Sequence, residues 1–387
     1  MAAETSSKFD FAVVGAGVFG AWTAHFLRAA GARVALLDAY GPANSRASSG
    51  GESRIIRKGY GPDEIYTEWA IRALPLWKEL FAQLARPELF RETGVLWIAP
   101  ENDAYALATA RALAKFGVES EKLDGGELRR RFPHFSFDDD AWGILEPRSG
   151  VLMARRAVQA LVERCQYAGV ECLPEAVIPL PPGSLPAQFA TASGRRISAG
   201  TYIFACGAWL GKLFPELLGD RIFPSRQEVF FFGPPPGNSV FQSPATPTWL
   251  YLKDEFYGMP DIEGRGFKLA DDRHGPSADP DSQSRAASPE SLARAREFLS
   301  RRFPALRDAP LVESRVCQYE NTSSGDFLID RHPSHENVWL VGGGSGHGFK
   351  HGPALGEYVA RLVTQGVEPE KRFGLASKGE VQRRAIH

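Results

Sequence analysis

A glycine-rich turn near the amino terminus constrains the fold of this chain more than any other feature of its sequence. The apolar residues 9–14 predict a short buried strand, and residues 21–30 predict a helix. The turn between them has the G-x-G-x-x-G spacing, with Gly15, Gly17 and Gly20. Such glycines allow a tight turn, close approach of the backbone to a pyrophosphate, and close packing of helix on strand. The sequence therefore predicts a nucleotide-binding βαβ unit.

The end of this unit favours a dinucleotide as the ligand. Residues 33–37 predict a second strand, and Asp38 follows it directly, where a carboxylate can bind ribose hydroxyls. The helix amino terminus offers N–H groups and partial positive charge to the phosphates. The loop by itself does not distinguish FAD from NAD.

The length and charge of the chain exclude several classes of protein. Its 387 residues are too many for one compact core, so we expect two domains. A formal net charge of −1, without long runs of one sign, argues against binding to nucleic acid. No segment reaches the roughly 18 apolar residues that span a membrane, and no targeting signal is recognisable. We therefore expect a cytoplasmic protein that binds no membrane.

The cysteines and histidines predict neither disulfides nor a metal site. Four cysteines in a chain of this length form no disulfide framework, and no pair has the spacing of a zinc site or a redox dithiol. Three of them are interpreted as small buried hydrophobic residues: Cys165, Cys172 and Cys206. Three histidines without metal-ligand spacing are interpreted as structural or surface residues: His274, His347 and His351.

A polar segment after the nucleotide-binding unit carries two arginines. Ser48 begins this segment, and Arg54 and Arg57 lie about one turn apart, on one face if the segment is helical. A guanidinium pairs bidentately with a carboxylate, so the two arginines suit anion recognition. The alternative is a solvated basic face, which the neighbouring Gly50 and the apolar residues 55–56 disfavour.

A second strand–turn–helix pattern lies near the carboxyl terminus. Residues 337–341 predict a strand and residues 353–363 a helix, with a turn too long for a second dinucleotide loop. Glycines in the turn let the backbone press against a flat group, and the helix amino terminus can stabilise negative charge there, as on a reduced flavin. The turn contains Gly344, Gly346, His347, Gly348 and Lys350.

These motifs, in this order, resemble the monomeric sarcosine oxidase family, which includes N-methyltryptophan oxidase and pipecolate oxidase. The resemblance runs from Phe9 to about Val363. It implies an enzyme that oxidises a secondary amino acid by hydride transfer to N5 of FAD, after which the imine hydrolyses and O2 is reduced to H2O2. It also implies an α/β fold, with a doubly wound Rossmann-like FAD-binding domain and a substrate domain that has a mostly antiparallel sheet.

Both domains are expected to be discontinuous. The FAD-binding domain is assigned residues 8–90, 150–222 and 322–375. The substrate domain is assigned residues 91–149 and 223–321, and residues 376–387 form a tail. The resemblance favours a monomer whose partners are an amino-acid substrate and O2.

The resemblance also implies roles for single residues. Cys317 matches the cysteine that bonds the 8α-methyl carbon of the flavin, which requires a thiolate, so we expect covalent FAD. Arg57 and Lys350 match the pair that binds the substrate carboxylate. Lys268 matches a lysine that activates oxygen by offsetting negative charge, and Arg54 matches an arginine close to the flavin. Tyr257 and Tyr319 match residues of the substrate cavity. The other expected FAD contacts are Ser48, Gly344, Gly346, His347, Gly348 and Lys350.

Two departures from the family leave the substrate open. Sarcosine and methyltryptophan oxidases have a histidine where this chain has Gly50, and another where it has Asp272. The loss of both imidazoles argues against sarcosine itself. Asp272 either places a carboxylate beside the cavity, which would admit a substrate with a second cationic group, or points into the loop that begins there.

Two other functions remain open from the sequence. One is a FAD amine dehydrogenase that passes electrons to a protein or a quinone, against which Lys268 argues. The other is a flavin-binding module without catalysis. The joint presence of Arg57, Lys268, Cys317 and Lys350 argues against this second alternative.

Overall fold

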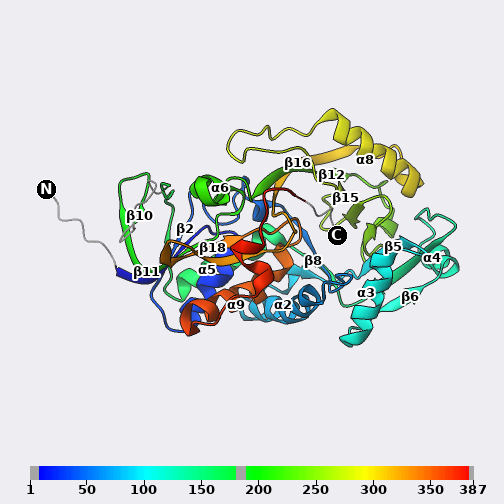
Figure 1. The fold of residues 1–387 in the computed structure, drawn as a ribbon. Helices are drawn as coiled ribbons and strands as arrows, with labels where there is room; N and C mark the ends of the chain where they lie inside the picture. Colours follow the sequence, from blue (N-terminus) through cyan, green and yellow to red (C-terminus); the bar gives the residue numbers. More distant parts are fainter. Residues whose placement is uncertain (1–7, 180–188, 383–387) are drawn as a thin grey trace.

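Two large sheets and one small sheet form the framework of the protein (Figure 1). The computed structural model describes residues 8–179 and 189–382. One large sheet carries the amino-terminal βαβ unit, and the other lies beside it under a long helix, α8 (Pro289–Arg302). The active-site candidates lie where these two parts meet.

The first large sheet is mostly parallel and is built around β1 (Lys8–Val14). This strand lies between β2 (Val34–Leu37) and β11 (Arg196–Phe204), parallel to both. Outside β11 lies β18 (His335–Gly342), also parallel. The remaining strands of this sheet are β9 (Glu171–Leu173), β10 (Phe189–Ala190) and β17 (Leu328–His332). The predicted doubly wound α/β sheet is confirmed.

Helices cover both faces of this sheet. On one face α1 (Val18–Ala29) packs against α5 (Ala154–Tyr167) and α9 (Gly352–Gln365). On the other face lie α6 (Leu210–Leu213) and α7 (Pro215–Leu218), which bury apolar side chains of a separate cluster. Figure 1 shows α6 and α9 on opposite sides of the sheet. The apolar strands are therefore buried on both sides, as a parallel sheet requires.

The second large sheet is antiparallel apart from one neighbouring pair, β13 with β5. This confirms the prediction of a mostly antiparallel sheet. In spatial order its strands are β16 (Leu311–Asn321), β12 (Phe223–Phe232), β15 (Phe267–Asp271), β14 (Phe256–Met259), β13 (Thr248–Tyr251), β5 (Val95–Pro100), β7 (Ala141–Glu146) and β6 (Glu121–Leu123). Near β5 and β6 lie α3 (Ala104–Lys115) and α4 (Gly125–Arg131), far from β10 (Figure 1).

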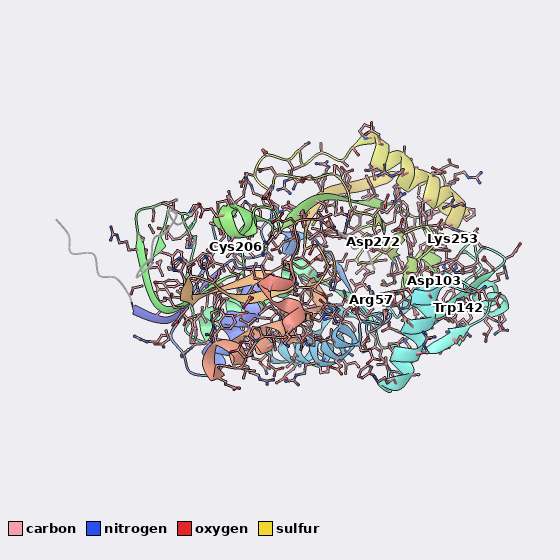
Figure 2. All side chains as sticks on the ribbon, in the orientation of Figure 1. Arg57, Asp103, Trp142, Cys206, Lys253 and Asp272 are labelled. Carbon is pink, nitrogen blue, oxygen red and sulfur yellow. The ribbon has the colours of Figure 1, made fainter. Side chains whose placement is uncertain are left out.

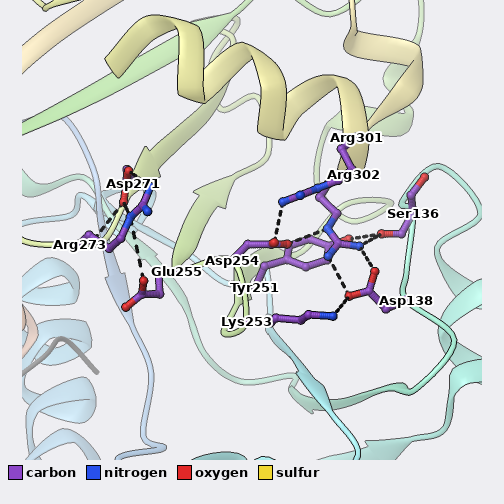
Figure 3. Close-up of polar contacts among 10 residues, drawn as sticks. All are labelled: Ser136, Asp138, Tyr251, Lys253, Asp254, Glu255, Asp271, Arg273, Arg301 and Arg302. Atoms are coloured by element: carbon purple, nitrogen blue, oxygen red, sulfur yellow. Dashed lines mark hydrogen bonds and ion pairs between the residues drawn. The ribbon is translucent and has the colours of Figure 1, made fainter. Parts of the chain in front are cut away.

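A buried arginine joins α8 to this sheet. Arg302 is 4% exposed, and its guanidinium forms ion pairs with Asp138 at 2.8 Å and Asp254 at 2.7 Å (Figure 3). It also lies over the ring of Tyr251, 5.0 Å from the ring centre. Because a buried charge is tolerated only when it is fully paired, these contacts fix the position of α8.

The small sheet shows that the segment of Arg54 and Arg57 is not helical, so the two arginines do not share a helical face. It consists of β3 (Arg54–Ile56), β8 (Gly150–Leu152) and β4 (Phe90–Arg91). Arg54 therefore begins a strand, and Arg57 follows that strand. The two arginines do not share a helical face, because pairing with β8 holds this segment extended. A second helix lies nearby, α2 (Glu64–Gln83), which packs against α9.

The two large sheets draw on separate parts of the chain. Strands of the first sheet come from residues 8–37, 171–204 and 328–342, and those of the second from residues 95–146 and 223–321. The domain ranges given above remain a proposal. Residues 383–387 of the predicted tail lie outside the described residues. Among the described helices, none combines the length and apolar character needed to cross a bilayer.

Candidate active site

Two cavities adjoin between the large sheets. The larger has a volume of about 380 Å³ and the smaller about 70 Å³. Their linings share Arg54, Tyr319, Gly346 and Phe349. Figure 2 places Arg57 and Asp272 in the middle of the molecule and Cys206 on the side of the first sheet. The expected cofactor residues and the expected substrate residues therefore meet at one junction.

The nucleotide loop opens onto the larger cavity. Gly15 and Gly17 line it, and Gly17 caps α1 without any side-chain hydrogen bond. Gly15 has φ +106°, and a Cβ there would lie 2.3 Å from the carbonyl oxygen of Ala205. Gly20 does not line the cavity; a Cβ on it would lie 1.9 Å from the carbonyl oxygen of Gly15. Gly20 thus sets how closely α1 approaches β1. Oγ of Ser49 accepts from the N–H of Val18 at 3.0 Å, and the helix end otherwise fits a phosphate group.

Two carboxyl groups lie along the same cavity. Asp38 accepts hydrogen bonds from the backbone N–H groups of Ala16 at 2.8 Å and Tyr40 at 2.9 Å, and burial nevertheless raises its pKa. Glu320 is 7% exposed, and burial raises its pKa to about 7. Among the described residues, Oε1 of Glu320 is buried without a hydrogen-bond partner. These groups fit a ligand that is rich in hydroxyls. The ribose and ribityl parts of FAD are such groups.

The carboxyl-terminal turn forms another part of the lining of the larger cavity. Gly344, Gly346 and Gly348 all contribute to it. Gly346 has φ +77°, and a Cβ there would lie 2.8 Å from the ring of Tyr319. A Cβ on Gly348 would lie 2.7 Å from the ring of Phe19. Glycine is required because the turn packs tightly against both rings, and it leaves a bare backbone surface for a flat group.

Two thiols face the larger cavity, in different surroundings. Nη2 of Arg54 lies 3.5 Å from Sγ of Cys317 on β16. The bond to a flavin requires the thiolate of cysteine as nucleophile, and this guanidinium is placed to pair with such a sulfur. Cys206 instead donates to the carbonyl oxygen of Val14 at 3.3 Å, and burial, with Asp38 and Glu320, raises its pKa well above the usual value. The first thiol is therefore suited to bond formation and the second is not.

The prediction of three buried cysteines is wrong for two of them. Cys165 is buried, as predicted, whereas Cys172 and Cys206 are partly exposed. Cys172 lies on the short β9 at the edge of the first sheet, and Cys206 lines the larger cavity.

One wall of the smaller cavity is cationic. The guanidinium of Arg57 lies 4.4 Å from the ring centre of Tyr60 and 4.5 Å from that of Trp97. Nζ of Lys350 donates to the hydroxyl of Tyr60 at 2.7 Å and to the carbonyl oxygen of His347 at 2.9 Å. Burial and the nearby Arg57 lower the pKa of Lys350 well below its usual value. Two fixed cationic side chains on one wall can bind a carboxylate.

A buried glutamate fixes this cationic wall. Glu146 accepts hydrogen bonds from the backbone N–H groups of Lys58 at 2.8 Å and Gly59 at 3.1 Å, and from Nε1 of Trp97 at 2.9 Å. It therefore holds both the loop after Arg57 and one ring beside its guanidinium. Neither Glu146 nor Tyr60 was found from the sequence, because their contacts join distant parts of the chain and no local motif signals them.

Asp272 lies on the cavity rather than in the loop, which resolves the two alternatives left by the sequence. It follows β15, and the hydroxyl of Tyr319 donates to its Oδ1 at 3.2 Å. Burial raises its pKa to about 6, although Arg57 and the hydrogen bond from Tyr319 act in the opposite direction. Tyr257 also lines this cavity, and burial raises its pKa to about 12.

Lys268 is buried against Ser53, the neighbour of Arg54 in the chain. It is 2% exposed, and its Nζ donates to the carbonyl oxygen of Ser53 at 2.9 Å and to Oγ of Ser53 at 3.1 Å. Burial first, and then Arg54, lower its pKa well below the usual value. It lines neither cavity in the protein alone. Strand alternation places Lys268 on the same face of β15 as Ala270.

Two histidines interpreted as structural or surface residues lie at the smaller cavity. His274 and His347 both line it, and Nε2 of Gln382 lies 2.6 Å from Nδ1 of His274. The predicted tail therefore contributes Gln382 to the site. His351 is buried, with its Nε2 2.7 Å from the hydroxyl of Tyr60. Within the described residues, no group of three His, Cys, Asp or Glu side chains is arranged to hold a metal ion.

Comparisons with known proteins agree with these features. Residues 10–362 match the family model described as FAD dependent oxidoreductase. Monomeric sarcosine oxidase from Bacillus sp. (strain B-0618) is 32% identical over 378 residues, which are 93% of this chain and 93% of the relative. N-methyl-L-tryptophan oxidase from Salmonella arizonae is 30% identical over 92% of this chain and 95% of the relative.

A solved structure shows the same fold. The crystal structure of L-proline dehydrogenase from P. horikoshii has a TM-score of 0.82 and 21% identity, over 96% of this chain and 97% of that chain. With a G-x-G-x-x-G loop at the larger cavity and relatives matched over nearly its whole length, the chain belongs to the FAD-dependent oxidoreductases and, within them, to the monomeric sarcosine oxidase family.

Proposed function

We propose that this protein is a FAD-dependent oxidase of N-substituted or cyclic amino acids that releases H2O2. One observation carries the proposal: a small cavity with two fixed cationic side chains, Arg57 and Lys350, opens beside the cavity that suits a dinucleotide. The family match and the names of the relatives support the same reaction class.

The chain offers a contact for each part of FAD. Gly15, Gly17 and the amino terminus of α1 hold the pyrophosphate, and Asp38 binds the ribose. Cys317 would hold the flavin through its sulfur, and Arg54 lies beside that sulfur. The bare backbone of the turn that contains Gly344, Gly346, His347 and Gly348 would hold the ring system, and Ser48 lines the same cavity. Bound FAD supplies the two-electron oxidant, which oxygen regenerates.

The smaller cavity then binds and orients the substrate. Arg57 and Lys350 bind its carboxylate, while Tyr257 and Tyr319 enclose its side chain. Fixed orientation would place the C–H bond next to nitrogen at the junction of the cavities, where FAD, when bound, would accept the hydride of the neutral amine. The resulting imine hydrolyses in water. Lys268 offsets the negative charge that develops as oxygen is reduced.

The carboxylate-binding role of Arg57 gives a direct prediction. In the wild type, N-methyl amino acids should reduce the flavin anaerobically much faster than the matching amines that lack the carboxylate. Replacement Arg57→Gln should remove roughly 2–5 kcal/mol of this preference, because it leaves the substrate carboxylate without its buried cation. The measurement is stopped-flow flavin absorbance with each pair of compounds.

A surface arginine provides the control for this experiment. Arg273 pairs with Asp271 and is about half exposed, so Arg273→Gln should keep the wild-type preference. The flavin is reduced at one rate by the amino acid and at another by the matching amine. If the ratio of these rates is the same in Arg57→Gln and in the wild type, Arg57 does not bind the carboxylate. The monomeric state and the cytoplasmic location accompany the proposal as predictions from the sequence.

A further inference from the structure

The smaller cavity carries both positive and negative charge. Arg57 and Lys350 form its cationic wall, and Asp272 lines the same cavity. Among the described residues, neither cation forms an ion pair with Asp272, although both act on it electrostatically. Tyr319 holds Oδ1 of Asp272 at 3.2 Å, and no hydrogen bond to Oδ2 is formed by the described residues. One carboxylate oxygen is thus free to receive a ligand.

Asp272 supplies the negative charge in the lining of the smaller cavity. No other Asp or Glu of the described chain lines the smaller cavity. The two histidines of this lining have other contacts: Nε2 of His347 lies 3.0 Å from the carbonyl oxygen of Gly325, and Nδ1 of His274 lies 2.6 Å from Nε2 of Gln382. A cavity lined by two cations and by a carboxylate that forms no ion pair with them matches the two charges of an amino-acid zwitterion.

We propose that Asp272 binds the ammonium group of the substrate and takes one of its protons, so that the amine is neutral when it is oxidised. This inference rests on the proposed function and deepens it. The substrate class that follows is a zwitterionic secondary amino acid, whose carboxylate binds Arg57 and Lys350 while its nitrogen binds Asp272.

The proton transfer has a simple balance of atoms. A secondary amine is protonated in neutral water, and its nitrogen then has no lone pair to support departure of hydride from the neighbouring carbon. When Oδ2 of Asp272 accepts the proton, an N–H bond breaks, an O–H bond forms, and the lone pair stays on nitrogen. The substrate loses no electrons in this step, so no further reagent is required.

The surroundings of Asp272 suit a group that gains and loses a proton near neutral pH. Burial raises its pKa to about 6, so it is ionised at pH 7 and still basic enough to accept a proton. Protonation as pH falls through about 6 removes the charge, and with it the attraction for an ammonium group. The titratable and charged side chains that face it or share the cavity are Arg54, Arg57, Tyr257, Asp271, His274, Tyr319, His347 and Lys350.

Binding of a matched pair of ligands tests the charge recognition without any turnover. Trimethylglycine carries a permanent cation, and 3,3-dimethylbutanoate is its neutral carbon isostere. Calorimetry on the flavin-containing wild type at pH 7.5 should show at least about tenfold tighter binding of trimethylglycine, because one buried charge pair is gained. Asp272→Asn should abolish this preference. The ratio is independent of the folded fraction of a variant, since both ligands report on the same protein.

The neighbouring aspartate supplies a matched control. Asp271 pairs with Arg273 at 2.6 Å and with Arg294 at 3.3 Å, and it does not line the smaller cavity (Figure 3 shows Arg273). Asp271→Asn should therefore keep the wild-type preference for trimethylglycine. Equal binding of both ligands by the wild type, or an unchanged preference in Asp272→Asn, would overturn the inference.

The pH dependence of anaerobic flavin reduction tests the proton transfer. In the wild type the rate with an N-methyl amino acid should fall as pH drops through about 6. In Asp272→Asn the rate at pH 7.5 should be roughly 100-fold lower and should recover toward pH 10, where the free amine deprotonates in water. A variant profile that has the same shape as the wild-type profile would contradict the role of Asp272 as base.

Failure of the inference and failure of the proposed function give different results. If no amine reduces the wild-type flavin, the proposed function is wrong, and the ligand pair still reports on Asp272. If N-methyl amino acids are oxidised while the wild type binds both ligands equally, the function stands and the role of Asp272 is wrong.

Discussion

Acid precipitation of the wild-type protein is expected to give a yellow pellet, whereas the pellet of Cys317→Ala should be colourless, with all flavin in the supernatant. The expected effect is complete, because a covalent bond survives unfolding and non-covalent contacts do not. The position of the thiol supports this result: Sγ lies at the larger cavity, 3.5 Å from the guanidinium of Arg54. A thiolate is the nucleophile that such a bond requires.

The second thiol of the cavity makes this test specific. Cys206 also lines the larger cavity, but burial and two nearby carboxyl groups raise its pKa well above the usual value. Cys206→Ala should therefore leave the pellet yellow. Mass spectrometry of the intact denatured proteins gives an independent measurement, since only variants with Cys317 should carry the mass of FAD. A colourless wild-type pellet would refute the covalent link.

Lys268→Met should slow reoxidation of the reduced flavin by oxygen by roughly 100- to 1,000-fold, while anaerobic reduction by substrate stays close to the wild-type rate. The magnitude follows from the removal of one preorganised positive group at a site of developing negative charge. Nζ of Lys268 is buried against Ser53, so little water can replace it. Stopped-flow mixing of reduced enzyme with oxygen measures this step alone.

The charge of Lys268 predicts a dependence on pH. Burial and Arg54 lower its pKa below the usual 10.5, so the cation is lost as pH rises through that lowered value, and reoxidation should slow in the same range. Lys268→Arg should retain most of the rate and lose this pH dependence, because guanidinium stays charged. Lys253, which is exposed and pairs with Asp138, provides the control Lys253→Met, with no expected effect. Equal slowing of reduction and reoxidation in Lys268→Met would refute the role.

The parts of the fold with strong local signals were predictable from the sequence. Residues 9–38 combine an apolar strand, a glycine turn, a helix and an acid, and the structure has this unit, with α1 beginning at Val18 inside the glycine motif. The strand before Gly344 and the helix after Lys350 were equally clear, because their apolar residues follow a regular period.

Contacts between distant parts of the chain were not predictable in the same way. The segment of Arg54 is extended because β8, far along the chain, pairs with it. Glu146 fixes the loop after Arg57, and Gln382 reaches the smaller cavity, through contacts that no local pattern encodes. The sequence left two alternatives for Asp272, one at the cavity and one in the following loop. The choice depends on where β15 ends, which no local pattern predicts.

Release of peroxide in air tests the central claim most directly. The purified protein should be mixed with a panel that contains sarcosine, N-methyl amino acids, pipecolate, proline, primary amino acids and sugar-modified amino acids, with oxygen uptake followed in parallel. The account predicts that at least one secondary amino acid releases one H2O2 for each O2 consumed, and that the matching amine without a carboxylate is a poor substrate. Flavin that is bleached anaerobically by a secondary amino acid, yet gives no peroxide in air, would contradict an oxidase and indicate a dehydrogenase. Flavin that no member of the panel bleaches would contradict the proposed function altogether.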